Sequence, residues 1–265
     1  MAFKMLKNIK PITSSLLNNE NIIHGFFTKN VDITKHNSLN LNYSFKNIRR
    51  KKPIYDNRKL IADYHNLKLT NLKTINQIHS NKVIIIDNNK QNTNNISADA
   101  LITKIPNIIL GILTADCAPT LIYDKKEKII AAIHIGWKGA YYNILEEAIK
   151  NMIILGANIN NLLLAIGPCI GPKSYEVKKD LIDKFIKKKE IYKSHFVKIN
   201  NKYYFNLANL IHSNALQIGL NKNNIWLANK DTYSNKRLFF SYRRNIKNNS
   251  PDLGRMISTI SLIKK

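Results

Sequence analysis

The apolar residues of this 265-residue chain fall in short runs, and the length of these runs most constrains the fold. The runs at 108–114, 129–135 and 161–166 have the length of a strand, well below the roughly 18 residues that a membrane-spanning helix needs. Amphipathic stretches alternate with them, which favours an α/β or α+β fold over a helix bundle or a β-sandwich. We expect one domain over 1–265, with 1–20 as a peripheral N-terminal segment, because a chain of this length can bury one sizeable core.

The spacing of apolar residues and the turn residues between the apolar runs predict the individual strands and helices. The sequence predicts strands at 22–28, 74–78, 82–87, 100–103, 108–113, 120–124, 129–135, 162–166, 196–199, 224–227, 237–242 and 255–262. It predicts helices at 56–65, 140–155, 178–188 and 206–219, the last with apolar residues at helical spacing.

The formal net charge of +25 comes from 35 Lys and 7 Arg that are spread from end to end. Specific nucleic-acid binders instead concentrate basic residues on one face with a recognisable reading motif, so we expect no specific nucleic-acid partner. Two cysteines are too few for a disulfide framework and fit a reducing cytosol. With no signal-peptide pattern and no membrane-length run, the sequence predicts a soluble, cytoplasmic protein without a membrane partner.

Two histidines and a cysteine are candidate metal ligands. His79, Cys117 and His134 each lie beside an apolar run, with 38 and 17 residues between successive members. Such spacing suits ligands gathered from separate strand ends rather than a zinc-finger knuckle. A thiolate with two imidazoles suits Zn²⁺ and leaves a fourth position open for catalysis, whereas Cu²⁺ fits the same donors. Isolated residues of these types are also common in cores, and that alternative stays open here.

The segment after His134 is a candidate anion site. The strand at 129–135 runs through Gly136, Lys138 and Gly139 into the helix predicted from residue 140. The start of a helix offers unpaired N–H groups and a partial positive charge, and Lys138 adds a full charge, so the segment suits phosphate. The alternative is that the two glycines only make a tight turn.

Eight motifs in fixed order resemble those of one family. They are His-Gly-Phe-Phe-Thr at 24–28, Asn-Ser-Leu-Asn-Leu at 37–41, Gln-Ile-His-Ser at 77–80, Ala-Asp-Ala-Leu-Ile-Thr at 98–103, Thr-Ala-Asp-Cys-Ala-Pro at 114–119, His-Ile-Gly-Trp-Lys-Gly at 134–139, Gly-Pro-Cys-Ile-Gly-Pro at 167–172 and Phe-Phe-Ser-Tyr-Arg-Arg at 239–244. This set resembles the YfiH-like family, whose members were first described as polyphenol oxidases or laccase-domain proteins and later as purine nucleoside phosphorylases.

The resemblance implies a single domain of mixed sheets sandwiched by helices, with zinc on the three candidate ligands. It implies phosphorolysis of adenosine, inosine and methylthioadenosine, with some adenosine deamination, so purine nucleosides and phosphate are the expected partners. Besides the ligands, Asp116 is then a candidate catalytic residue that orients a histidine, works as an acid or base, or forms a turn. Ser38 and Arg243 join Gly136, Lys138 and Gly139 as candidate substrate or phosphate contacts.

Some positions depart from the family pattern. Relatives generally carry Arg at Lys29, mostly Arg at Lys138, and a cysteine at Asp231. A lysine gives a point charge where arginine gives a two-pronged donor, so phosphate binding is expected to differ if either lysine contacts it. Arg243 and Arg244 directly follow the strand predicted at 237–242 and are expected to alternate as on a strand, so at most one of them faces the site and a surface salt bridge is the alternative for the other. Cys169 is expected to pack rather than react.

Three other functions are open at this stage. A copper-dependent phenol oxidase is the first, although seven histidines without His-x-His pairs are few for a multi-copper centre. The second is a metal-free hydrolase in which Cys117 is the nucleophile and His134 its base. The third is a binding protein without catalytic activity.

Overall fold

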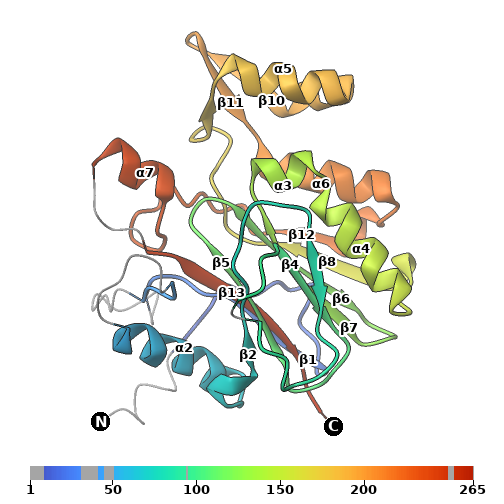
Figure 1. Cartoon of the computed structure of the whole chain (residues 1–265). Helices are drawn as coiled ribbons and strands as arrows, with labels where there is room; N and C mark the ends of the chain where they lie inside the picture. The colour runs from blue at the N-terminus through green and yellow to red at the C-terminus, as the bar shows by residue number, and fades with distance from the viewer. Residues whose placement is uncertain (1–8, 31–40, 45–50, 94, 250–253, 265) are drawn as a thin grey trace.

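The protein has four layers: two β-sheets face each other, and helices cover their outer faces (Figure 1). The structure is a computed structural model that describes residues 9–30, 41–44, 51–93, 95–249 and 254–264. One sheet has the strand order β1 (Ile22–Phe26), β13 (Met256–Leu262), β5 (Ile109–Thr114) and β2 (Leu72–Lys73). The other has the order β12 (Ile225–Leu227), β8 (Leu162–Ile166), β6 (Ala118–Asp124), β7 (Ile129–Ile135), β4 (Ala100–Thr103) and β3 (Val83–Ile85).

A small third sheet projects from these layers at the top of Figure 1. Its order is β10 (Phe196–Ile199), β11 (Lys202–Phe205) and β9 (Glu176–Val177). The helices are α2 (Lys52–Tyr64), α3 (Trp137–Tyr141), α4 (Ile144–Ile154), α5 (Lys179–Lys188), α6 (Leu207–Ile218) and α7 (Tyr242–Lys247). Short 3₁₀ turns are η2 (Leu69–Asn71), η3 (Ile159–Asn161), η4 (Glu190–His195) and η5 (Lys222–Asn224).

Both large sheets are mixed. In the six-stranded sheet β6 pairs antiparallel with β7 and β8, and β4 pairs antiparallel with β7, whereas the outer strands β3 and β12 pair parallel with their neighbours. In the four-stranded sheet β13 lies antiparallel between β1 and β5, and β2 is parallel to β5. The fold class and the mixed sheets between helices expected from the sequence are confirmed.

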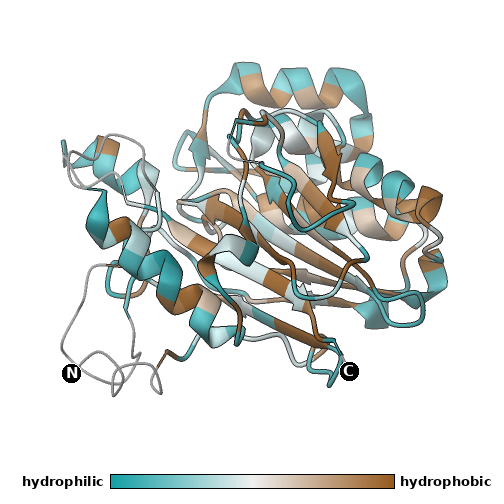
Figure 2. Cartoon of the chain, turned by 60° about the horizontal axis from the view of Figure 1, so that its bottom comes forward, coloured by the Kyte–Doolittle hydropathy of each residue, from teal (hydrophilic) through white to brown (hydrophobic). Residues whose placement is uncertain are grey.

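Strand β7 shows how the layers are held together. Its odd-numbered residues from Ile129 to Ile135 pack with α4 and α6, and its even-numbered Ile130 and Ala132 pack against the four-stranded sheet. A strand buried on both faces must be apolar throughout, which explains its unbroken apolar run. Helix α2 covers the outer face of the four-stranded sheet through Ile61. Figure 2 shows the result, with apolar residues in the sheets and polar residues on the outer helix faces.

Three of the predicted elements are wrong. The segment 74–78 is not a strand, because the side chain of Gln77 replaces the backbone ladder by bonding both the N–H and the C=O of Leu113. The helix predicted at 140–155 begins earlier and breaks, because Asn143 adopts φ 61° between α3 and α4. The segment 237–242 ends in helix α7 rather than a strand, with Ser241 as its N-cap.

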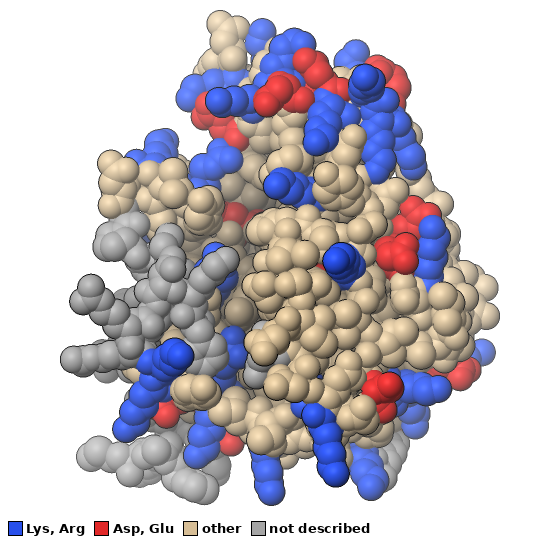
Figure 3. Space-filling view, in the orientation of Figure 1, with Lys and Arg blue, Asp and Glu red and all other residues tan. Residues whose placement is uncertain are grey.

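The charge follows the composition. In the view of Figure 3, Lys and Arg are distributed from the top to the bottom of the face rather than gathered in one stripe. Among the described residues no helix is both long and apolar enough to cross a membrane.

Candidate metal centre

Two strand ends and a loop meet at one end of the six-stranded sheet. Cys117 directly precedes β6, and His134 is the next-to-last residue of β7, where it lies opposite Pro119. Odd and even residues of paired strands alternate between faces, and the packing places both side chains on the side of the four-stranded sheet. His79 reaches the same end from the loop before β3.

The three side chains form a compact ligand set, here called the His–Cys–His cluster. Their ligand atoms all lie within 4.8 Å of one another, and Cys117 Sγ lies 3.9 Å from His79 Nε2. Tetrahedral zinc, with Zn–S near 2.3 Å and Zn–N near 2.0–2.1 Å, places such atoms about 3.6 Å apart. The cluster therefore fits one metal ion with little movement, and it is the only such group among the residues that the structure describes.

The electrostatics of the cluster favour a thiolate at Cys117 and a protonated imidazole at His134. Burial raises the pKa of the Cys117 thiol, but the neighbouring imidazoles of His134 and His79 outweigh burial and lower it to about 6. Burial lowers the pKa of His134, whereas the charge of Cys117 and the bond to Asp99 raise it more. A thiolate is therefore present at neutral pH, and a metal cation would replace the proton shared within this pair.

Asp99 is a residue of the site that the sequence analysis did not identify. It is fully buried at the start of β4, and its Oδ1 accepts a 2.8 Å hydrogen bond from His134 Nδ1. Burial raises the pKa of Asp99, but hydrogen bonds from His134 and Ser80 outweigh it and lower the pKa to about 2. With Nδ1 occupied in this way, His134 has its Nε2 left for a metal.

Gly136 closes the cluster from the backbone side. A Cβ at this position would lie 2.9 Å from Cys117 Sγ and 3.1 Å from His79 Cδ2. Gly136 is also the N-cap of α3, so the helix begins at Trp137 and Lys138 and Gly139 belong to its first turn. Lys138 is exposed, with its Nζ 5.6 Å from the Trp137 ring centroid.

Asp116 does not contact a cluster histidine. Its carboxylate accepts hydrogen bonds from Thr232 Oγ1 at 2.7 Å, Ser241 Oγ at 2.9 Å and the backbone N–H of Arg243 at 2.7 Å. The last two groups belong to the start of α7, so Asp116 attaches that helix to the segment carrying Cys117. Of the roles considered for Asp116, the contacts match capping and turn formation.

The two arginines of α7 have separate contacts. Arg243 donates to the Glu176 carbonyl at 2.6 Å, and its guanidinium lies 5.4 Å from the Tyr175 ring centroid. Arg244 donates to the carbonyls of Thr232, Tyr233 and Phe239. The two arginines lie in a helix and not in a strand, so the alternation expected from a strand does not apply to them.

The remaining singled-out residues are placed as follows. Cys169 is buried, and burial raises its pKa to about 12, consistent with packing. Asp231 accepts bonds from Gly171 N and Ser174 Oγ and so holds the loop that leads to Tyr175. Lys29 Nζ lies 5.7 Å from the Phe240 ring centroid. Ser38 lies outside the described residues.

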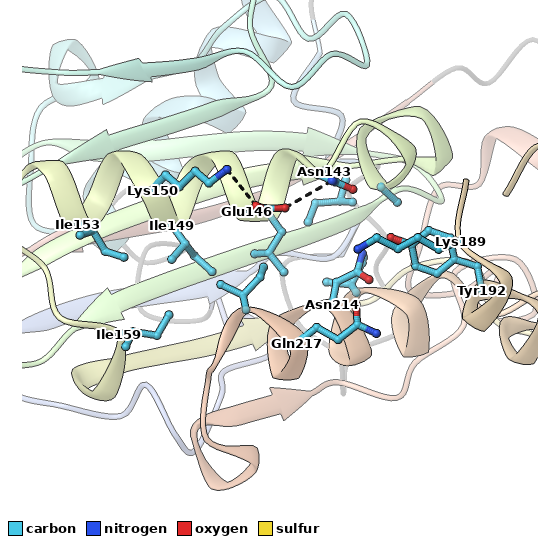
Figure 4. Close-up of a pocket in the computed structure, with 15 residues that line it drawn as sticks. Asn143, Glu146, Ile149, Lys150, Ile153, Ile159, Lys189, Tyr192, Asn214 and Gln217 are labelled. Atoms are coloured by element: carbon cyan, nitrogen blue, oxygen red, sulfur yellow. Dashed lines mark hydrogen bonds and ion pairs between the residues drawn. The ribbon is translucent and has the colours of Figure 1, made fainter. Parts of the chain in front are cut away.

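A separate cleft of about 490 Å³ lies between α4 and α6 (Figure 4). Isoleucines including Ile149, Ile153 and Ile159 line one part, and polar groups including Glu146 and Asn214 line another. Ile135, the neighbour of His134, also lines it. Because adjacent strand residues point to opposite faces, this cleft lies on the other side of the sheet from the His–Cys–His cluster.

The fold and the cluster define a layered α/β protein with a three-ligand site suited to a metal. A family model described as multi-copper polyphenol oxidoreductase laccase matches residues 23–263. The chain belongs to this family, the YfiH-like family of the sequence motifs.

Known proteins resemble the chain over nearly its whole length. It is 31% identical over 245 residues, 90% of this chain and 93% of the relative, to a protein of Haemophilus influenzae named purine nucleoside phosphorylase. It is 30% identical to a protein of Rickettsia conorii that carries the same enzyme name, over 91% of this chain and 97% of that relative. A solved structure, the hypothetical protein YfiH of Bacillus licheniformis, superposes with a TM-score of 0.81 at 26% identity and covers 92% of this chain and 93% of that chain.

Proposed function

We propose that the protein is a zinc-dependent purine nucleoside phosphorylase that also deaminates adenosine. The observation that carries the proposal is the His–Cys–His cluster, whose ligand atoms fit one metal ion and whose His79 is exposed. Three protein ligands with an open fourth position are typical of catalytic zinc. The enzyme name shared by relatives about 30% identical supports purine nucleosides and phosphate as substrates.

His79, Cys117 and His134 would hold the metal. When bound, zinc would supply a Lewis acid able to orient a phosphate oxygen or activate water. Phosphate attack on the ribose gives ribose 1-phosphate and the free base, and water attack on the purine ring gives the deaminated nucleoside. Cys/His-bound zinc serves deamination in other enzymes, so the two activities are compatible.

Phosphate is assigned to the first turn of α3. The N–H groups that follow Gly136 lack partners within the helix, and Lys138 brings a positive charge to the same turn. Ser38, known only from its family motif, is proposed to contact the substrate as well.

The nucleoside base is assigned to Tyr175 and Arg243. Asp116, the residue before Cys117, accepts a 2.7 Å bond from the Arg243 N–H, so Arg243 and the Tyr175 ring beneath its guanidinium lie near the cluster. The Arg243 guanidinium packs on the same ring. A planar ring with a guanidinium suits the π-face of a purine. Asp116 would hold Arg243 in place through its backbone N–H.

A copper-dependent phenol oxidase is the second candidate, because the family description names it. One three-ligand cluster among the described residues suits one ion, whereas a multi-copper centre needs more ligands. His24 and His65, which could have contributed, are buried in hydrogen bonds with Ser14, Thr259 and Ser261. We therefore favour the phosphorylase.

The test is product analysis on one preparation purified without added metal. Adenosine with phosphate should give adenine and ribose 1-phosphate, adenosine alone should give inosine slowly, and a chelator should remove both activities. Cys117→Ala should retain neither zinc nor activity. Phenol oxidation with copper but no phosphorolysis would favour the second candidate, and activity that survives chelation would favour a Cys–His hydrolase.

A further inference from the structure

Asp99 bonds to two of the three segments that carry the cluster ligands. Its Oδ1 accepts from His134 Nδ1 at 2.8 Å and from the backbone N–H of His79 at 2.9 Å. Its Oδ2 accepts from Ser80 N at 2.6 Å, Ser80 Oγ at 2.8 Å and Ile78 N at 3.3 Å. One fully buried carboxylate thus bonds segments that carry two of the three candidate ligands.

The backbone at His79 requires this carboxylate. His79 has φ 60°, in the left-handed region that non-glycine residues rarely occupy. In this conformation the N–H groups of residues 78–80 converge on one anion, as in an anion-binding nest. An uncommon backbone conformation persists only where the surroundings fix it. The carboxylate is the common acceptor of the three N–H groups, and the loop that it fixes carries the imidazole of His79 to within 3.9 Å of Cys117 Sγ.

The sheet in turn fixes Asp99. Its C=O accepts a 2.7 Å bond from His134 N, and its N–H donates to the Lys82 carbonyl at 3.0 Å. Lys82 directly precedes β3 and His134 lies in β7, and both of these strands pair with β4. The carboxylate position is therefore set by strand pairing and not by the cluster.

We propose that Asp99 is the positioning residue that forms the site before any metal binds, by holding the His79 backbone and the His134 ring at once. Through Nδ1 it sets His134 to present Nε2, and through the nest it sets the direction of His79. The inference rests on the proposed metal site, and it is independent of which reaction the site catalyses.

The experiment compares Asp99→Asn with Asp124→Asn. Asparagine keeps the shape of Asp99, but its NH₂ cannot accept the bonds that one carboxylate oxygen now takes. Asp124 is a matched control: it is equally buried and accepts backbone N–H bonds from Lys126, Glu127 and Asn158 at the opposite end of β6 from Cys117. Zinc affinity is measured by competition with a chromophoric chelator, and Co²⁺ absorption reports the thiolate and imidazole ligands.

Asp99→Asn should weaken zinc binding about 10- to 100-fold and alter the Co²⁺ spectrum. Asp124→Asn should lower the melting temperature but leave both metal readouts unchanged. Equal zinc affinity in Asp99→Asn and wild type would overturn the proposal, as would a loss in both variants that follows the loss of melting temperature. Should Asp99→Asn not fold, Ser80→Ala removes one of the five bonds and should weaken zinc binding a few-fold, and no change would overturn the proposal.

A metal-free readout separates this inference from the proposed function. In ¹H–¹⁵N NMR of the metal-free protein, the His134 Nδ1–H that donates to Asp99 should give a hydrogen-bonded, slowly exchanging signal in wild type, and this signal should shift and exchange faster in Asp99→Asn. If wild type binds no zinc but shows this difference, the positioning role stands and the metal-dependent function fails. If zinc binds and the NMR spectra of the two proteins agree, the function stands and the positioning role fails.

Discussion

Replacing Gly136 with alanine should damage the metal site through a single methyl group. Gly136 has φ −90° and ψ −178°, an extended conformation that any residue adopts, so the backbone itself does not oppose the change. The obstacle is space, because the new Cβ would lie 2.9 Å from Cys117 Sγ and 3.1 Å from His79 Cδ2. Two of the three ligands therefore have to give way.

The size of the effect follows from these distances. Carbon atoms and their non-bonded neighbours prefer about 3.5–4.0 Å, so Sγ and the ring must each move by roughly 0.4–1 Å. Metal–ligand distances tolerate only about 0.2 Å. We expect zinc affinity to fall at least as much as on loss of an outer hydrogen bond, about 10- to 100-fold, or roughly 1.4–2.7 kcal/mol. Overpacking should cost the metal-free protein about 1–3 kcal/mol of unfolding free energy.

Chelator competition and thermal melting of the metal-free protein measure the two effects separately. Gly139→Ala is the control, since it adds the same methyl three residues later in α3. There the nearest atom is Ile144 Cγ2 at 3.2 Å, a side-chain methyl that can shift. The carbonyl oxygens of His134 and Ser80 lie at ordinary contact distances of 3.5 and 3.7 Å, and no ligand side chain is among the nearest atoms. Wild-type zinc affinity in Gly136→Ala, or an equal loss in both variants, would refute the reasoning from space at Gly136.

Two further predictions concern phosphate and acid. Lys138→Ala should raise the KM for phosphate more than the KM for nucleoside, as measured by steady-state kinetics with each substrate varied in turn. Lys184→Ala is the control, because it removes the other ammonium that lies 5.6 Å from the Trp137 ring centroid, and it should leave the phosphate KM unchanged. An unchanged phosphate KM in Lys138→Ala would mean that phosphate binds elsewhere. Burial lowers the pKa of His24 to about 4 and that of His65 to about 3, from an ordinary value of 6.5. Below pH 6.5 the unfolded chain therefore binds protons that the folded chain does not bind. The contribution of these two histidines to stability should thus be constant above about pH 6.5. It should fall by up to about 3 kcal/mol for His24 as the pH drops towards 4, and by up to about 5 kcal/mol for His65 as the pH drops towards 3. Urea unfolding between pH 7.5 and 4.5 measures this, and equal stability at both ends would contradict it.

The sequence predicts those elements whose cause is local. Strand β7 and strand β8 have the predicted bounds, because a continuous apolar run between turn residues leaves one solution. The ligand residues could be nominated for a similar reason, since their types and their positions at strand ends are visible in the chain. Their distances could not be predicted, because they depend on how β4, β6 and β7 pair.

The predictions that proved wrong fail because contacts with distant parts of the chain decide the local structure. The break at Asn143 has no glycine or proline to announce it; it is held from α5, where Lys188 Nζ donates to Tyr141 O and Asn143 Oδ1. Helix α7 replaces the predicted strand because Asp116, more than 120 residues away, accepts the Arg243 N–H. Asp99 was overlooked because its partners lie 19 to 35 residues away in sequence. Nothing local distinguishes it from an ordinary aspartate before a strand.

The backbone strain beside the cluster is compensated by the protein itself. His79 and Asp116 both have positive φ, 60° and 88°, and one is a candidate ligand while the other precedes Cys117. Each is fixed by buried carboxylate hydrogen bonds, His79 through Asp99 and Asp116 through its own bonds to Thr232 and the start of α7. These bonds belong to strand pairing and helix capping, which form on folding. It follows that a metal ion would bind to a site whose backbone is already in place. Little of its binding free energy would then be spent on ordering the loops, so its affinity would be higher than at a site that folds on binding.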